Sequence, residues 1–74
     1  MKEFSLRLRE LREKQCPVRS RKVTSELCGL HPDAVRRYER GEAVPDAKAL
    51  EAIADYFEVS MDWLWRGENF KKSP

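Results

Sequence analysis

The chain has 74 residues, of which 41% are hydrophobic and 38% are charged, and its formal net charge is only +2. A chain of this length fits one small domain that buries about 60% of the surface its unfolded form exposes, so no large catalytic cleft is expected. The composition is too apolar for a disordered chain and too interrupted by charge for a membrane span or a signal peptide. We therefore expect a soluble, cytoplasmic protein.

The charge is distributed unevenly along the chain. Residues 1–18 hold five basic and three acidic side chains, and residues 19–41 hold six basic and three acidic ones. Residues 42–62 hold one basic and six acidic side chains. This asymmetry would turn residues 19–41 toward a polyanion, although the low overall charge predicts weak non-specific binding.

The first predicted helix carries an apolar stripe at Phe4, Leu8 and Leu11, which have i, i+4 and i+7 spacing. Leu6 lies off this stripe and is interpreted as ordinary surface. Pro17 is expected to end the helix, because the residue before a proline disfavours helical dihedrals. The basic side chains of the segment are expected to stay in solvent, namely Arg7, Arg9, Arg12 and Lys14.

A second short helix is predicted to begin after Ser20, its expected N-cap. Arg21 and Lys22 lie in its first turn, where the positive end of the helix dipole disfavours them unless an anion shares the site. A DNA phosphate would be such an anion, and two exposed charges with a small penalty are the alternative. The segment alone favours the exposed charges, whereas the arginine-rich helix that follows and the family resemblance described below together favour the phosphate. The inward-facing residues of the second helix are predicted to be Val23, Thr24, Leu27 and Cys28.

Gly29 is the expected end of this helix, because a residue without a Cβ reaches left-handed dihedrals at little steric cost. A third helix is predicted from Pro32 to Arg40, with Pro32 suited to its first position. His31 is its expected cap and Gly41 its terminator. Two apolar residues are expected to anchor the helix and three arginines to project outward from it, namely Val35 and Tyr38, and Arg36, Arg37 and Arg40.

The two cysteines, Cys16 and Cys28, form no CxxC pair, and the single histidine leaves a four-ligand metal site short of ligands. We expect no metal and reduced structural thiols, with Cys28 in the core beside Leu27 and Val35. The capping role of His31 is favoured over a ligand or base role. The three glycines are isolated, so no nucleotide-cradling loop is signalled and no cofactor is expected.

Pro45 marks a turn, after which Asp46 is the expected cap of a fourth helix. Ser60 is the expected cap of a short last helix from Met61 to Trp65. The predicted inward-facing residues of these two helices are Leu50, Ile53, Ala54, Phe57 and Leu64.

Trp63 and Trp65 cannot both point inward on so short a helix, so at least one indole is expected to be partly exposed. Such a ring would form a dimer surface, or it would lie flat over Phe4 or Phe57, and the two interpretations stand as equals. Residues 68–74 are polar and patternless, which predicts a loose tail.

Four segments, in the same order as in the family, resemble phage-repressor and Cro-like helix-turn-helix domains, also called the xenobiotic-response-element type. They are FSLRLRELREK, ELCGL, RRYERGEAVPD and LEAIADYFEVSMDWLW, and together they cover almost the whole chain. The resemblance implies an all-α, compact five-helix, lambda-repressor-like DNA-binding domain over residues 1–67. Its second and third helices would form the motif, with the third helix in the major groove.

The chain departs from the family pattern at several positions. Thr24 stands where the family usually has a core leucine, and Ser25 where it usually has alanine. Glu58 takes the place of a helix-ending glycine. Pro32 and Asp33 occupy early positions of the recognition helix where side chains that donate to bases are common.

The resemblance and the charge pattern together predict a DNA-binding site. Arg36 and Arg37 would enter the major groove, and Arg37 is the first candidate base reader because arginine binds guanine O6 and N7 with two bonds. Asp33 would accept from a cytosine amine or orient Arg37. Phosphate contacts would set the register of the protein on DNA. The predicted site comprises Ser20, Arg21, Lys22, His31, Pro32, Asp33, Arg36, Arg37 and Arg40.

The predicted function is sequence-specific binding of double-stranded DNA as a transcriptional regulator, and the resemblance makes it a repressor of prophage or bacterial type. A homodimer formed through residues 61–65 is expected, because one short recognition helix covers too few base pairs. The alternative is a protein-interaction module of the same fold that does not bind DNA, such as an antitoxin-like partner, and Pro32, Asp33 and the low net charge favour it. No catalytic constellation is visible, so neither an enzyme nor a membrane partner is expected.

Overall fold

Five helices make up the described part of the chain, residues 2–67 of this computed structural model. They are α1 (Lys2–Glu13), α2 (Arg21–Leu27), α3 (Ala34–Glu39), α4 (Ala47–Phe57) and α5 (Met61–Arg66). These residues contain no strand, so the predicted all-α class is confirmed. Within the same range no helix is long and apolar enough to cross a membrane. The predicted loose tail, residues 68–74, lies outside the described residues.

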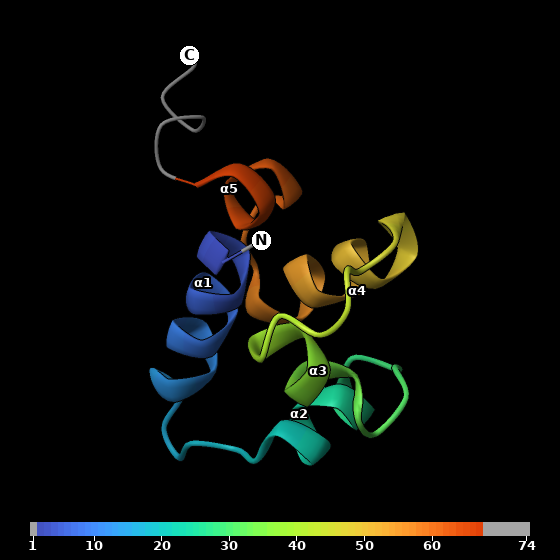
Figure 1. Cartoon of the computed structure of the whole chain (residues 1–74). Helices are drawn as coiled ribbons and strands as arrows, with labels where there is room; N and C mark the ends of the chain where they lie inside the picture. The colour runs from blue at the N-terminus through green and yellow to red at the C-terminus, as the bar shows by residue number, and fades with distance from the viewer. Residues whose placement is uncertain (1, 68–74) are drawn as a thin grey trace.

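The helices are arranged so that α2 and α3 form one end of the molecule (Figure 1). α1 packs against both α3 and α5, α2 packs against α3, and α4 packs against α5. Figure 1 shows α5 at the opposite end from α2. α1 therefore connects the α2–α3 pair at one end of the molecule with α5 at the other.

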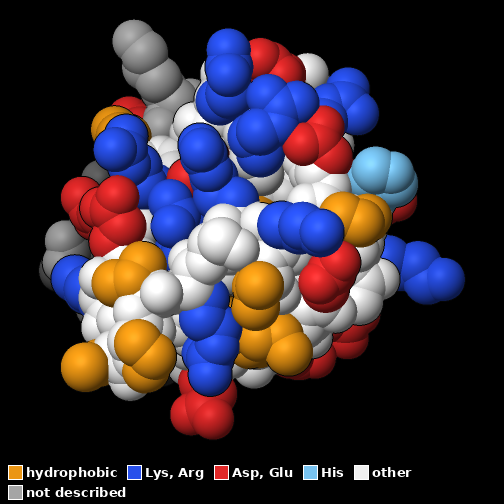
Figure 2. Space-filling view, turned by 90° about the horizontal axis from the view of Figure 1, so that it is seen from below, with side chains coloured by type: hydrophobic (Ala, Val, Ile, Leu, Met, Phe, Trp, Pro, Cys, Tyr) orange, Lys and Arg blue, Asp and Glu red, His pale blue; other side chains and the backbone are white. Residues whose placement is uncertain are grey.

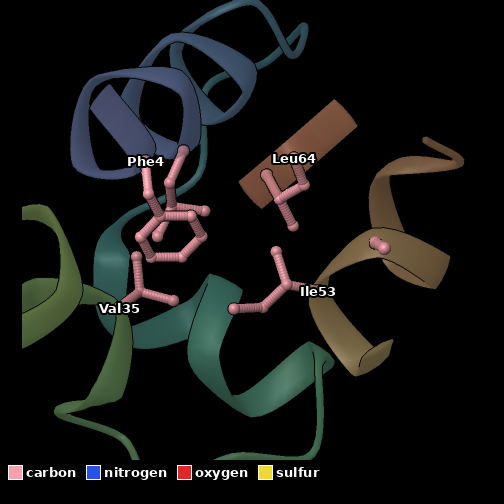
Figure 3. Packing of buried hydrophobic residues seen from close by; sticks show 6 residues of the cluster. Phe4, Val35, Ile53 and Leu64 are labelled. Atoms are coloured by element: carbon pink, nitrogen blue, oxygen red, sulfur yellow. The ribbon is translucent and has the colours of Figure 1, made fainter. Parts of the chain in front are cut away.

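The hydrophobic core receives side chains from four of the helices. Figure 3 shows Phe4, Val35, Ile53 and Leu64 converging on one region between their helices, and burial of these apolar side chains is the main force that holds the helices together. The predicted stripes of α1, α4 and α5 are confirmed. The buried cluster comprises Phe4, Leu8, Val35, Ile53, Ala54 and Leu64, and partly buried residues packed against it include Leu11, Leu50 and Phe57.

Three predicted N-caps are confirmed by hydrogen bonds to the first turn of their helices. Ser20 Oγ accepts from the Val23 amide of α2 at 3.1 Å, and Asp46 Oδ1 accepts from the Ala49 amide of α4 at 2.8 Å. Ser60 Oγ accepts from an amide of α5 at 3.0 Å. Each bond satisfies one of the free N–H groups that every helix start leaves.

Three helices end on a residue with left-handed dihedrals. Gly29 after α2 and Gly41 after α3 have φ values of 76° and 74°, as predicted for these glycines. Glu58 after α4 has φ 59° and ψ 45°, the conformation for which the family uses glycine. The prediction for α1 is wrong, because this helix ends at Glu13, well before Pro17.

Two basic residues of α1 that were expected in solvent are bound to other helices. Arg12 forms a two-bond ion pair with Glu39 of α3, with N–O distances of 2.7 and 3.0 Å. The two side chains are only 11% and 3% exposed. Arg7 donates to the C-terminal carbonyls of α5, Leu64 O at 2.9 Å and Trp65 O at 2.6 Å. The helical pattern predicted that these two side chains lie off the apolar stripe, but it could not predict which groups of other helices they bind.

The inward face predicted for α2 is wrong for two of its residues. Val23 and Leu27 are 41% and 53% exposed, whereas Thr24 and Ser25 are fully buried. The helix is thus rotated by about one residue from the face that its hydrophobicity predicts. The Ser25 hydroxyl accepts from a backbone amide of α3 at 2.9 Å, and this bond requires Ser25 to face inward.

The two tryptophans of α5 differ in burial, as expected for so short a helix. Trp63 is partly buried and packs against the core cluster, whereas Trp65 is 37% exposed. The Trp65 ring also contacts Phe4, with 5.4 Å between ring centroids and 50° between the planes. The predicted exposure of one indole is confirmed, and the contact with Phe4 accounts for only part of its surface.

Candidate nucleic-acid interface

The turn between α2 and α3 is held by backbone hydrogen bonds and by one imidazole. The Leu30 amide donates to Ser25 O at 2.9 Å, which closes the end of α2. His31 Nδ1 accepts from the Asp33 amide at 3.1 Å, but Asp33 occupies the N-cap position of α3, so the prediction of His31 as the N-cap is wrong and its ring stabilises the turn instead. α3 begins at Ala34 and not at Pro32, because Pro32 and Asp33 belong to the turn. The predicted helix from Pro32 to Arg40 is too long at its start.

Ser25 connects the two helices of the motif, a role that the sequence pattern did not indicate. Its Oγ accepts from the Val35 amide in the first turn of α3 and donates to Arg21 O at 2.8 Å. The residue at the N-cap position of α3, Asp33, makes no capping bond with its own side chain. Ser25 therefore satisfies from α2 an amide that a local cap would otherwise bind.

The three arginines of the α3 region differ in their partners. Arg36 forms a two-bond ion pair with Asp33, with Nε–Oδ1 at 2.6 Å and Nη2–Oδ2 at 2.8 Å. Arg40 pairs with Glu42 at 3.0 Å. The Arg37 guanidinium makes no hydrogen bond or ion pair within residues 2–67. The expectation that Asp33 orients Arg37 is wrong, because Asp33 holds Arg36 instead.

The ion pair shifts the acid–base equilibria of both of its members. The hydrogen bond from Arg36, more than any other interaction, lowers the pKa of the Asp33 carboxyl below its ordinary value. The same bond raises the pKa of Arg36. The pair is therefore charged on both sides at neutral pH.

A recess of about 380 Å³ lies between α1, the start of α2 and the end of α3. Four arginines reach it, and the single carboxylate among its lining residues belongs to Glu39, which Arg12 binds. Two of the lining residues, Arg9 and Arg12, were not expected in a site. The helical spacing of Arg9 and Arg12 indicated only a solvated face of α1. Packing of α1 against α3 places both side chains at the recess. The recess is lined by Arg9, Arg12, Ser20, Arg21, Glu39 and Arg40.

A second, smaller recess of about 220 Å³ lies beside α3 and brings His31 and Arg37 together. Tyr38 and the exposed Val44 of the α3–α4 connection also line it. The structure thus separates the predicted site into two groups. Ser20, Arg21 and Arg40 surround the arginine recess, whereas His31 and Arg37 lie in this one. Lys22 and Pro32 are exposed and line neither recess.

Figure 2 views the molecule from the end where α2 and α3 lie. Lys and Arg side chains gather over one part of this face, and hydrophobic side chains gather over another part. Exposed hydrophobic residues of α2 and the connections on either side of the motif include Val18, Val23, Leu27 and Val44. The end of the molecule therefore combines a basic surface with an apolar one.

The described residues hold no group of three His, Cys, Asp or Glu side chains placed to bind a metal ion. Both cysteines are free thiols, Cys16 exposed and Cys28 half-buried. Cys28 packs against the core cluster, where burial raises the pKa of its thiol to about 11. The expected position of Cys28 in the core is confirmed in this partial sense, but Leu27 does not accompany it there.

Residues 3–69 match the family model of a helix-turn-helix domain, so the chain belongs to this family. Members of the family are non-enzymatic DNA-binding domains. The fold is similar to that of the P22 c2 repressor protein, crystallised in complex with a synthetic operator, with a TM-score of 0.79 and 25% sequence identity. This likeness covers 92% of the present chain and 100% of the other. A search of curated proteins finds no match to the chain.

Proposed function

We propose that this domain binds specific sequences in double-stranded DNA through α3 and acts in the cytoplasm as a transcriptional repressor. The observation that carries the proposal is the state of Arg37, whose guanidinium is unpaired among the described residues while Arg36 and Arg40 are paired. An unpaired arginine on an exposed helix keeps its donors for a ligand. Membership of the helix-turn-helix family supports DNA as that ligand, and so does the likeness to a repressor bound to its operator.

The arginine recess is the proposed contact with the DNA backbone. Ser20, Arg21, Arg9 and Arg40 line it together with the Arg12–Glu39 pair. Arg9 is paired with Glu13 and Arg40 with Glu42, both on the exposed surface, whereas no such partner is seen for Arg21 among the described residues. A phosphate in this recess would also relieve the unfavourable placement of basic residues in the first turn of α2. Such contacts set the register and orientation of the protein but carry no sequence information.

Arg37 is the proposed base reader in the major groove. Its guanidinium can donate two parallel hydrogen bonds to guanine O6 and N7. No other base presents two acceptors in this geometry in the major groove. His31 shares a recess with Arg37, and Pro32 lies in the turn that precedes α3, so both are proposed to lie at the edge of the groove. Repression would follow from occupancy, because a bound domain excludes other proteins from the same DNA.

A homodimer is the proposed DNA-binding species. The partly exposed Trp65 gives α5 an apolar surface at the end of the molecule opposite α2. Two subunits would place their recognition helices in half-sites about 34 Å apart on one side of the duplex. Sedimentation of the free protein and of its DNA complex tests this arrangement, and a monomer in both measurements would contradict it.

A protein-interaction role is the second candidate, and one specific observation favours it. Val23 and Leu27 lie at i and i+4 on α2 and are both exposed, which gives the motif an apolar stripe that DNA does not need. A partner protein with an apolar groove would cover this stripe. The same domain would then keep the helix-turn-helix fold without reading DNA.

Selection of bound sequences from a random pool of duplex DNA separates the two candidates. A sequence-specific DNA-binding domain enriches a defined motif, and an interaction module enriches nothing. Leu27→Asp is a matched control, because it disrupts the apolar stripe without removing any predicted DNA contact. If the parent enriches a motif and Leu27→Asp enriches the same one, the DNA-binding proposal stands. If no motif emerges, it fails.

A further inference from the structure

Asp33 and Arg36 form a two-bond ion pair on the exposed side of α3. Nε and Nη2 of the guanidinium donate to the two carboxylate oxygens at 2.6 and 2.8 Å. The side chains remain 38% and 40% exposed, so the pair is accessible from outside the domain. The carboxylate binds the edge of the guanidinium formed by Nε and Nη2. This side-on geometry fixes the plane of the guanidinium as well as its position.

Asp33 is free to make this pair because other residues cap α3. Asp33 occupies the N-cap position, where an aspartate commonly accepts from an amide of the first turn. Here Ser25 Oγ accepts from the Val35 amide, and His31 Nδ1 accepts from the Asp33 amide itself. The Asp33 carboxylate is therefore not required to satisfy the helix start.

The side-on pair leaves the far end of the Arg36 guanidinium available. A guanidinium has five N–H groups, and the pair engages one on Nε and one on Nη2. One remaining N–H on each Nη points away from the carboxylate, and the two are nearly parallel. This spacing fits the O6 and N7 acceptors of guanine in the major groove.

We propose that Asp33 is a positioning residue that holds Arg36 for recognition of guanine, so that the pair reads a second base beside the one read by Arg37. The inference rests on the proposed DNA-binding function. The carboxylate also gives the pair no net charge, which weakens its attraction to a phosphate and favours a base edge over the backbone. Arg36 makes the contact, and Asp33 acts through it.

The test compares five proteins on the site that the parent selects from random duplex DNA. Arg36→Ala removes the proposed reader, and Asp33→Asn keeps the shape of Asp33 but removes its charge. Glu42→Gln is the matched control, because it weakens the similarly exposed Arg40–Glu42 pair nearby. The fourth protein is the double variant that combines Asp33→Asn with Arg36→Ala, and the fifth is the parent. Dissociation constants are measured on the selected site and on all of its single-base variants, with helicity and thermal unfolding recorded for each protein.

Arg36→Ala is expected to lose about 5- to 150-fold of discrimination at one G·C pair. Asp33→Asn is expected to lose about two- to tenfold at the same pair, because Arg36 must then be ordered when DNA binds. The double variant is expected to be no worse at that pair than Arg36→Ala. Glu42→Gln is expected to keep all base preferences. Replacing the guanine by 7-deazaguanine, which lacks N7, is expected to weaken the parent but not Arg36→Ala.

Three results would overturn the inference, and they have different meanings. If Asp33→Asn keeps every preference of the parent, Asp33 does not position a reader, while the proposed function is untouched. If Asp33→Asn loses preference at a different base pair from Arg36→Ala, Asp33 reads a base itself. If the parent selects no sequence, the proposed function fails and the inference fails with it.

Discussion

Thr24 and Ser25 are adjacent, fully buried residues of α2 whose hydroxyl groups differ in hydrogen bonding. Ser25 Oγ both accepts and donates a hydrogen bond. Thr24 Oγ1 is buried without a hydrogen-bond partner in the described structure. An unsatisfied buried hydroxyl lowers stability, whereas a satisfied one that joins two helices raises it. Both residues are polar where the family usually has an apolar one. Thr24 is expected to lower the stability of the domain, whereas Ser25 is expected to raise it.

Thr24→Val is expected to raise the free energy of unfolding by about 1 kcal/mol. Valine has nearly the shape of threonine and removes the hydroxyl that lacks a partner, so the packing around it changes little. Urea denaturation of the two proteins provides the measurement. A loss of stability would mean that Thr24 Oγ1 has a partner after all.

Ser25→Ala is expected to lower the free energy of unfolding by about 1–2 kcal/mol, although alanine is the residue that the family usually has there. The variant leaves the Val35 amide at the start of α3 without its acceptor. Denaturant unfolding gives the size of the loss, and amide hydrogen exchange at Val35 reports it locally. Unchanged protection of that amide would argue against the cap.

Cys28 is expected to react with thiol reagents far more slowly than the exposed Cys16. The thiolate is the reactive form, and burial raises the pKa of Cys28 to about 11. Below that pH its thiolate fraction, and with it the labelling rate, should rise about tenfold per pH unit. Mass spectrometry of time-resolved labelling at pH 7–9 would follow both residues. Equal rates in the native state would show that α2 is packed differently.

At the scale of the element, the end of α4 is the place where local sequence and conformation conflict. The Val59 amide bonds to Ala54 O at 2.9 Å, and the Glu58 amide bonds to Asp55 O at 3.2 Å, so the helix closes in a Schellman motif. This motif requires left-handed dihedrals at Glu58, whose Cβ makes them costly. α2 and α3 end in the same way on glycine, where that cost is absent.

Glu58→Gly is expected to stabilise the domain by about 0.5–1 kcal/mol. The gain is the released dihedral strain less the extra backbone entropy of glycine in the unfolded chain. Glu58→Ala is the control, because it removes the charge but keeps the Cβ and should give no comparable gain. Thermal and urea unfolding of the three proteins would decide the point, and equal gains in both variants would assign the effect to charge.

For the whole molecule, the position of each arginine decides what it can contact. Arg37 projects from α3 beside the turn, whereas Arg21 lines the recess at the start of α2, together with residues from α1 and α3. The first position suits a base edge and the second a phosphate. The two classes of contact have different signatures, because only phosphate contacts are insensitive to sequence.

Arg37→Ala is expected to weaken binding to the selected site by about 1–3 kcal/mol and to relax preference at one base position. Arg21→Ala is expected to weaken binding to all sequences alike and to lower the slope of log K against log salt by about one unit. Binding titrations at several salt concentrations on the selected site and its variants test both. If Arg37→Ala binds the site and its variants as the parent does, α3 is not the recognition helix.

The sequence by itself determined the features that depend on neighbouring residues. The caps at Ser20, Asp46 and Ser60 and the turn at Gly29 were predictable, because each rests on contacts within a few residues. The apolar stripe of α1 and the family motif were predictable for the same reason. These local signals fixed the number and order of the helices.

Only the tertiary structure decided which faces and partners the helices use. The Arg12–Glu39 pair and the Ser25–Val35 bond join residues far apart in sequence, and together they set the packing of α1 and α2 on α3. The rotation of α2 accompanies such a contact, because the Ser25 hydroxyl has to face inward to bind the Val35 amide. The choice of Arg36 over Arg37 by Asp33 was open in the sequence, since both spacings allow a pair on a helix. In the structure, Ser25 and His31 bind the amides at the start of α3, so the Asp33 carboxylate is free, and it binds Arg36.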